Sequence, residues 1–152
     1  RLDYYITDPI AREHSRRSRT PLADFRSTVR AGGSVQKFQC FFPHPELTPA
    51  VVERLQREFP QLEISSSLPS NLEINAPGAN KGAGLLALCR ELDMTPADAV
   101  AFGDGTNDLT MLRQAGVGVA MGNADPGGLA SADQIAPSNQ EDGVAQVLSQ
   151  WF

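Results

Sequence analysis

Hydrophobic and polar residues alternate along short stretches in the first half of the chain. Residues 62–65 and 72–75 read LEIS and LEIN, and this period of two is typical of half-buried strands that pair with one another. Residues 35–42 form an aromatic and apolar run that ends at Pro43, which predicts a further strand stopped by a turn. Residues 2–7 are a shorter candidate strand.

Residues 48–59 follow a helical period instead. Apolar residues recur there at the spacing of one helix face, at positions 51, 52, 55 and 59. We expect Thr48 to cap the N-terminus of this helix, Pro49 to occupy its first position and Pro60 to close it. The first half is therefore predicted to be a small β-α-β-β unit that is open on one face.

The second half changes character after Pro77 and Gly78, because helical and strand patterns then alternate. Strands are predicted at 99–102, 117–121 and 134–136, and helices at 82–92, 107–115 and 141–152, with a short turn capped by Thr95. Such alternation indicates parallel strands joined by crossover helices. Ligands gather at the carboxyl ends of parallel strands, where the turns at Asp104 and at Gly122–Asn123 lie.

Composition bounds the possible functions. The chain has 152 residues, enough for one full-sized domain or two small lobes. The formal net charge of -5 argues against a nucleic-acid partner, and no apolar run approaches the roughly 20 residues of a membrane helix. The Arg-rich segment at 12–19 is expected to be solvated surface, the alternative being a patch that meets an anionic substrate or partner.

The cysteines and histidines do not form a zinc motif. Cys40 and Cys89 are isolated, without CxxC spacing, and His14 and His44 have no partner cysteines. Isolated free thiols are typical of a reducing compartment, so we expect a cytoplasmic protein.

The segment AVAFGDGTNDL at 99–109 carries the first candidate site. Asp104 follows a buried strand between two glycines, and Asp108 lies four residues on, in the first turn of the next predicted helix. Two carboxylates and the amide of Asn107 supply oxygen ligands, which suit Mg²⁺ better than zinc or copper. The alternative is that these residues only cap the helix, while an EF-hand is excluded because its alternating ligands and closing Glu are missing.

A second candidate is Lys81, in the segment PGANKGAG at 77–84. Small residues surround this lysine just before a predicted helix N-terminus, where backbone N–H groups favour phosphate. The alternative is a solvated lysine in a flexible loop. The segment is not a P-loop, because GxxxxGK[ST] is absent.

Short motifs follow one another in a characteristic order, as EIN at 73–75, NKG at 80–82, GDGTNDL at 103–109, ML at 111–112, AGVGVAMGNA at 115–124, AD at 132–133 and SNQEDGV at 138–144. This order resembles the Cof-type phosphatases of the haloacid dehalogenase superfamily. The resemblance implies an α/β fold, with a Rossmann-like parallel sheet core and a partial α/β cap. It places the partial cap at residues 1–76 and the C-terminal part of the hydrolase core at residues 77–152.

The resemblance also implies an activity and roles for single residues. In this family a nucleophilic aspartate attacks a phosphomonoester, and water hydrolyses the resulting aspartyl-phosphate with the help of Mg²⁺. By resemblance, Lys81 neutralises the nucleophile and the phosphate, and Asp104 binds Mg²⁺ directly. Asp108 holds the waters of the metal or supports Asp104, Asn107 reaches the phosphate or Lys81, and Asn123 supports the site through its loop. Substrates would be small phosphorylated metabolites such as sugar phosphates, or flavin or pyridoxal phosphates.

The chain departs from the family pattern in its first motif. The family's nucleophile lies in an Asp-x-Asp motif after an apolar strand, but here residues 5–10 read YITDPI, with Ile10 in place of the second acid. Because the chain also opens with Arg1, we interpret it as part of a longer protein whose preceding core segment supplies the nucleophile, and we expect it to be inactive alone. A non-catalytic module that binds phosphate or Mg²⁺ and a phosphomutase of the same superfamily are the alternatives.

Overall fold

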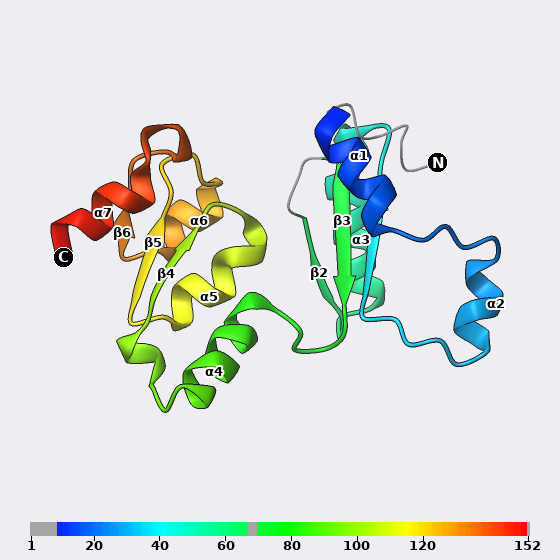
Figure 1. The fold of residues 1–152 in the computed structure, drawn as a ribbon, viewed down its shortest axis with the longest axis horizontal. Helices are drawn as coiled ribbons and strands as arrows, with labels where there is room; N and C mark the ends of the chain where they lie inside the picture. The colour runs from blue at the N-terminus through cyan, green and yellow to red at the C-terminus, as the bar shows by residue number, and fades with distance from the viewer. Residues whose placement is uncertain (1–8, 67–69, 152) are drawn as a thin grey trace.

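The computed structural model describes residues 9–66 and 70–151, so the candidate strand at 2–7 lies outside the described residues. The elements form two separate sheets, one in each half of the chain (Figure 1). No helix within these described ranges is long and apolar enough to cross a membrane.

The first half forms an antiparallel sheet in the order β1-β3-β2. Its strands are β1 (Lys37–Phe41), β2 (Glu63–Ser65) and β3 (Asn71–Asn75), and helix α3 (Thr48–Glu58) connects β1 to β2. The strand patterns in the sequence predicted this β-α-β-β unit. The central strand β3 pairs with both neighbours, so that Glu73 lies opposite Gln39 on one side and Ser65 on the other.

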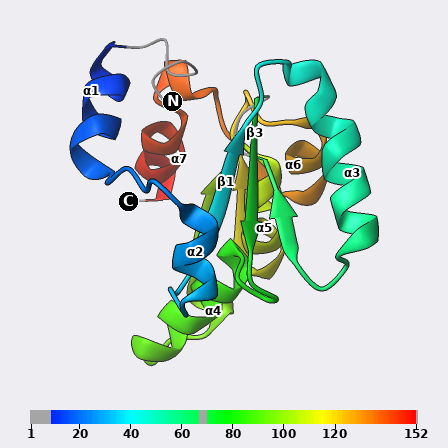
Figure 2. The same ribbon diagram turned by 90° about the vertical axis from the view of Figure 1, so that its right-hand side faces the viewer.

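Alternation gives this sheet one apolar and one polar face. Phe38, Ile64 and Ile74 occupy matched positions on the apolar face, where Leu72 is also buried. Helix α3 packs against β2 and β3 (Figure 2), so this face forms the interior of the first half. The polar side chains of the same strands are left on the opposite face.

The second half forms a parallel sheet in the order β4-β5-β6. Its strands are β4 (Val100–Gly103), β5 (Val117–Ala120) and β6 (Gln134–Ile135). Crossover helices α5 (Leu109–Gln114) and α6 (Pro126–Ser131) join them, α4 (Lys81–Glu91) precedes the sheet, and α7 (Gly143–Trp151) ends the chain. The predicted parallel α/β arrangement is confirmed.

Helices cover both faces of the parallel sheet. On one face, Gly118 of β5 lies so close to α5 that an added Cβ would be 2.2 Å from the carbonyl oxygen of Leu112. On the other face, Val119 and Met121 pack with Val147 of α7 in the hydrophobic core. Polar groups therefore collect at the ends of the strands rather than on the faces of the sheet.

Several predicted details differ from the structure. The short 3₁₀ turn at Pro45–Leu47 runs directly into α3, so Leu47 holds the N-cap position with helical dihedral angles. Thr48 was expected to be the cap, but it is the first helical residue, and it is buried. Its hydroxyl finds no hydrogen-bond partner within the part of the chain that the structure describes.

Three helices were not predicted. The Arg-rich segment lies largely in α1 (Pro9–Ser18) and is mostly exposed, as expected for solvated surface. Helix α2 (Phe25–Arg30) begins after an Asp24 cap, and α6 begins after an Asp125 cap whose carboxylate accepts a hydrogen bond from the N–H of Gly128.

The close approach at Gly118 predicts a large effect of one added methyl group. Gly118→Ala must push β5 away from α5, so we expect the free energy of unfolding to fall by about 2 kcal/mol or more. The matched control is Gly84→Ala in α4, where an added Cβ meets no atom within 4 Å and helix propensity predicts a gain of about 1 kcal/mol. Urea unfolding of both variants measures the difference, and equal effects would refute this packing.

Candidate active site

The turn that follows β4 brings two aspartates together at the carboxyl end of the parallel sheet. Gly103 ends β4, and a 3₁₀ turn at Thr106–Asp108 leads into α5. A Cβ on Gly103 would lie 2.5 Å from the Cβ of Asp108, so only glycine lets Asp108 fold back against the strand end. Asp104 remains exposed at the tip of the turn, whereas Asp108 is 3% exposed.

The carboxylate of Asp108 is surrounded by hydrogen-bond donors. Its Oδ2 accepts hydrogen bonds from the backbone N–H groups of Asp104 and Gly105, both at 3.0 Å. Its Oδ1 accepts a hydrogen bond from the ammonium of Lys81 and forms an ion pair with it. One buried side chain therefore fixes the turn and anchors the lysine.

These contacts shift the pKa of Asp108. Burial acts to raise the pKa of this carboxyl, but the hydrogen bonds from Lys81, Gly105 and Asp104 and the positive charge of Lys81 act in the opposite direction. The donors prevail, and the pKa of Asp108 lies below its ordinary value of 3.8. Asp108 is therefore ionised in the folded protein at neutral pH.

Lys81 is held at this site by the start of α4. The Oδ1 of Asn80 accepts the N–H of Ala83 at 2.9 Å and so caps the helix. The N–H of Gly82 donates to the hydroxyl of Thr110 in α5 at 3.1 Å, and α4 packs along α5. The ammonium of Lys81 thereby faces Asp108 while its side chain stays 49% exposed, which leaves it accessible to an anion.

Asn123 lies beside Asp104, as its place after β5 predicted. Its Nδ2 donates to Asp104 Oδ2 at 3.1 Å, and its Oδ1 accepts the backbone N–H of Asn139 at 2.9 Å. The carbonyl of Asp104 also accepts the N–H of Asp125 at 3.1 Å. Asp104 is thus oriented by the loops that follow β5 and β6.

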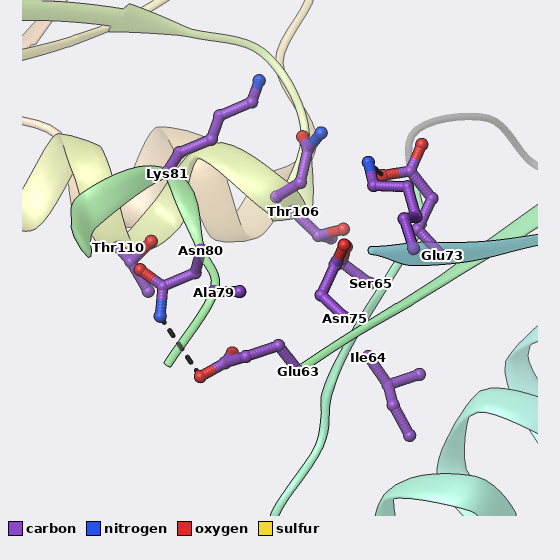
Figure 3. A pocket seen from close by; sticks show the side chains of 12 residues that line it. Glu63, Ile64, Ser65, Glu73, Asn75, Ala79, Asn80, Lys81, Thr106 and Thr110 are labelled. Atoms are coloured by element: carbon purple, nitrogen blue, oxygen red, sulfur yellow. Dashed lines mark hydrogen bonds and ion pairs between the residues drawn. The ribbon is translucent and has the colours of Figure 1, made fainter. Parts of the chain in front are cut away.

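A cleft of about 270 Å³ lies between the two halves of the chain (Figure 3). Lys81, Asn107, Thr106 and Thr110 line it from the C-terminal half, so the structure brings Asn107 to the same cleft as Lys81. Strands β1, β2 and β3 line it from the other half. Hydrogen bonds connect the halves here: Asn80 Nδ2 donates to Glu63 Oε1 at 3.2 Å, and Thr106 Oγ1 donates to the carbonyl of Ser66 at 2.9 Å.

The donor set at Asp104 is compatible with Mg²⁺. This ion usually keeps several waters and binds proteins through one or two carboxylates together with substrate phosphates, and Asp104 offers one exposed carboxylate beside an amide. Among the described residues, no three His, Cys, Asp or Glu side chains gather into a metal cluster. Asp104 is therefore suited to be one ligand of a partly hydrated ion, while Asp108 has both oxygens engaged elsewhere.

Three charged or capping groups at this cleft were not predicted from the sequence, namely Lys37, Glu63 and Asn80. Asn80 had a signal, since an Asn before a helical run is a common N-cap. Glu63 lies between two apolar residues and Lys37 precedes one, but only the strand order shows that their face meets the cleft.

The chain is similar to known proteins in sequence and in structure. The sequence profile of the haloacid dehalogenase-like hydrolases matches residues 3–148. The chain belongs to this family. Its sequence and structural relatives identify it more closely with the Cof-type phosphatases, subclass IIB, of the haloacid dehalogenase superfamily.

Two curated relatives are phosphatases. The 5-amino-6-(5-phospho-D-ribitylamino)uracil phosphatase YcsE of Bacillus subtilis is 44% identical over 101 residues, which cover 66% of this chain and 40% of that protein. The HMP-PP phosphatase of Yersinia enterocolitica is 39% identical over 116 residues, which cover 74% of this chain and 42% of that protein. The chain therefore spans less than half the length of these relatives.

Solved structures of the haloacid dehalogenase superfamily share this fold. A haloacid dehalogenase-like hydrolase from B. subtilis superposes with a TM-score of 0.79 and 28% identity, over 94% of this chain and 51% of that one. A subclass IIB sugar phosphatase superposes with a TM-score of 0.70 and 27% identity, over 80% of this chain and 45% of that one.

The position of Asp108 predicts a pH-dependent stability. Folding lowers the pKa of Asp108. The resulting stabilisation is complete at a pH above the ordinary pKa of the carboxyl, and it is lost as the pH falls through the lower pKa of the folded protein. In Asp108→Asn, the side-chain NH₂ group would face either the two backbone N–H groups or the ammonium of Lys81, all of which are donors. We therefore expect the free energy of unfolding to fall by about 2 kcal/mol at neutral pH. Urea unfolding measures this difference between pH 7 and roughly pH 3, and it should shrink toward the acid end.

Asp93→Asn serves as the control, because Asp93 is exposed in the turn after α4. Its effect should stay within about 0.5 kcal/mol. A loss for Asp108→Asn that is as large at acid pH as at neutral pH would show that the charge of this carboxylate does not matter.

Proposed function

We propose that this chain is part of a Mg²⁺-dependent phosphatase that hydrolyses small phosphorylated metabolites through an aspartyl-phosphate. The observation that carries the proposal is the convergence of Lys81, Asp108, Asp104 and Asn123 at the carboxyl end of the parallel sheet. This is where α/β proteins bind ligands. The phosphatase activities of YcsE and of the HMP-PP phosphatase support the same reaction class.

The residues of this chain have separate roles in the proposal. Lys81 presents its ammonium to the phosphoryl group and offsets the negative charge that spreads over its oxygens. Asp108 fixes the position of Lys81, and Asn107, its neighbour in the 3₁₀ turn before α5, contacts the phosphate. Asp104, held by Asn123, binds the metal. Mg²⁺ at Asp104 would neutralise phosphate charge and orient the group for attack.

We further propose that residues 1–76 are part of the cap and residues 77–152 the C-terminal part of the core. The two sheets support this division, because the antiparallel strands end at Asn75 and α4 begins at Lys81. The cleft between them would then bind the substrate, with the phosphate toward Lys81 and the leaving group toward the antiparallel sheet.

The nucleophile is proposed to come from a segment outside this sequence, which contains no Asp-x-Asp. Strand β4 lies at the edge of the parallel sheet in the described structure, so its free backbone groups can pair with a further strand. An aspartate at the carboxyl end of such a strand would lie beside the Asp104 turn. Its attack on phosphorus would release the alcohol, and water would then hydrolyse the aspartyl-phosphate.

The assembled enzyme is this chain joined to the N-terminal part of YcsE. We expect Asp104→Asn to remove most of its phosphatase activity. Loss of a charged metal ligand should lower kcat by at least about a hundredfold. The control is Asp98→Asn, in the turn that precedes β4 at the opposite end of the strand. Turnover of p-nitrophenyl phosphate at saturating Mg²⁺ measures both variants, and near-normal activity of Asp104→Asn would refute the metal role.

The 152-residue chain alone should not hydrolyse p-nitrophenyl phosphate, because it lacks the nucleophile, whereas the assembled enzyme should. A matched preparation of Asp104→Asn reveals any contaminating phosphatase. Activity of the chain above that background would show that the nucleophile lies within it. Phosphate transfer by the assembled enzyme to a second sugar hydroxyl instead of water would identify a phosphomutase, and binding without turnover would identify a non-catalytic module.

A further inference from the structure

The loop that follows β6 carries the motif SNQEDGV at residues 138–144. It lies at the carboxyl end of the parallel sheet, like the loop that follows β5 (Figure 1). The N–H of Gly122 donates to the carbonyl of Pro137 at 3.4 Å, which holds the two loops together. The N–H of Asn139 donates to Asn123 Oδ1 at 2.9 Å, so the motif reaches the candidate site through the side chain of Asn123.

The hydrogen bond from Asn139 fixes which end of the Asn123 amide faces Asp104. With Oδ1 of Asn123 engaged in this way, its Nδ2 donates to Asp104 Oδ2 at 3.1 Å. A flipped amide would set its NH₂ group against the N–H of Asn139 and its oxygen against the carboxylate, which would pair donor with donor and acceptor with acceptor. The described residues give Asp104 Oδ1 no hydrogen-bond partner, so this oxygen is left for a cation.

Glu141 holds the backbone of Asn139 in the position that this contact needs. Its Oε2 accepts hydrogen bonds from the N–H of Ser138 at 3.1 Å and from the hydroxyl of Ser138 at 2.6 Å. The N–H of Glu141 donates back to the carbonyl of Ser138 at 3.1 Å, which closes a 3₁₀ turn at Asn139–Glu141. The hydroxyl and the N–H of Ser138 also hold the pKa of the Glu141 carboxyl below its ordinary value, so this side chain is an ionised acceptor at neutral pH.

Helix α7 anchors the same turn from its other side. Gln146 Nε2 donates to the carbonyl of Glu141 at 2.6 Å, and the N–H of Gly143 donates to the carbonyl of Ser138 at 3.1 Å. An added Cβ on Gly143 would lie 2.0 Å from the carbonyl oxygen of Pro137, so the chain is closely packed where the helix begins. The position of the Glu141 carboxylate is therefore transmitted to the first residue of the turn.

We propose that Glu141 is a positioning residue for the metal ligand Asp104. It acts through the backbone N–H of Asn139 and the amide of Asn123, and the proposal rests on the proposed role of Asp104 in binding Mg²⁺. Without the Glu141 carboxylate the 3₁₀ turn loosens, so the Asn123 amide is no longer fixed. Asp104 then gains rotational freedom that metal binding must remove, and the affinity for the metal falls.

The test measures Mn²⁺ binding to the assembled enzyme without substrate, from the electron paramagnetic resonance signal of the free ion. Glu141→Ala should raise the dissociation constant of Mn²⁺ about three- to tenfold, less than the loss of a group that contacts a metal ligand directly. Glu141→Gln should bind Mn²⁺ like the wild type, because glutamine also closes capping boxes. In turnover of p-nitrophenyl phosphate, Glu141→Ala should need about three- to tenfold more Mg²⁺ for its half-maximal rate, with kcat at saturating Mg²⁺ little changed.

A double variant tests the route of the effect. Asn123→Ala alone should raise the dissociation constant of Mn²⁺ at least about tenfold, because it removes the group that touches Asp104. Once this amide is gone, the turn has nothing to orient, so adding Glu141→Ala should not weaken Mn²⁺ binding further. Additive losses of affinity would show that Glu141 acts by another path and would overturn the proposal.

Asp98→Ala is the matched control, because it breaks the same kind of capping box in the turn that precedes β4. Asp98 Oδ2 accepts the N–H of Thr95 at 2.9 Å and its hydroxyl at 2.7 Å, at the opposite end of the strand from Asp104. This variant should lose stability as Glu141→Ala does but keep the Mn²⁺ affinity of the wild type. Equal losses of affinity in the two variants would reduce Glu141 to a general stabilising residue and overturn the proposal.

The failure of this proposal can be distinguished from the failure of the proposed metal role. If Asp104→Asn abolishes Mn²⁺ binding but Glu141→Ala binds Mn²⁺ like the wild type, Glu141 does not position the metal ligand. If Mn²⁺ binding survives Asp104→Asn unchanged, the proposed role of Asp104 is itself wrong.

Discussion

The carboxylate of Asp108 joins two parts of the candidate site, the turn after β4 and the start of α4. It receives the N–H groups of the turn after β4 on one oxygen and the ammonium at the start of α4 on the other. A buried charge is tolerated only when its hydrogen-bonding capacity is satisfied, and here the satisfying groups are those that the site must position. The cost of burying Asp108 is therefore offset by the same contacts that hold Lys81 and orient the backbone at Asp104.

The demands of burial also explain where the polar residues lie. In the N-terminal half, α3 occupies one face of a three-stranded sheet, and the other face carries the polar members of each alternating strand. In the C-terminal half, helices cover both faces of the parallel sheet, so polar side chains gather at its carboxyl edge. The cleft lies where these two polar regions meet.

Local patterns in the sequence predicted most elements, because strand alternation and helical spacing are short-range signals. They also indicated Lys81 and Asp104, which stand at a helix start and at a strand end. The details that depend on tertiary contacts were not accessible. The place of Lys37 in the cleft requires the order β1-β3-β2, and Thr48 lost its expected capping position because a preceding 3₁₀ turn continued into the helix. Helix α6 was missed because its glycine-rich sequence has low helix propensity, although Asp125 and Pro126 are a recognisable start.

The amide of Asn80 links the two walls of the cleft through its two ends. Its oxygen caps the helix that carries Lys81, and its nitrogen donates to Glu63 on the antiparallel sheet. A ligand that draws Glu63 toward itself must rearrange this amide and thereby perturb the first turn of α4. A ligand at Glu63 and an anion at Lys81 would therefore influence each other through this one side chain, and such an influence is reciprocal. In the proposed phosphatase, the two ends of a phosphoester would be sensed together, so that inorganic phosphate and the free alcohol would not bind as independent ligands.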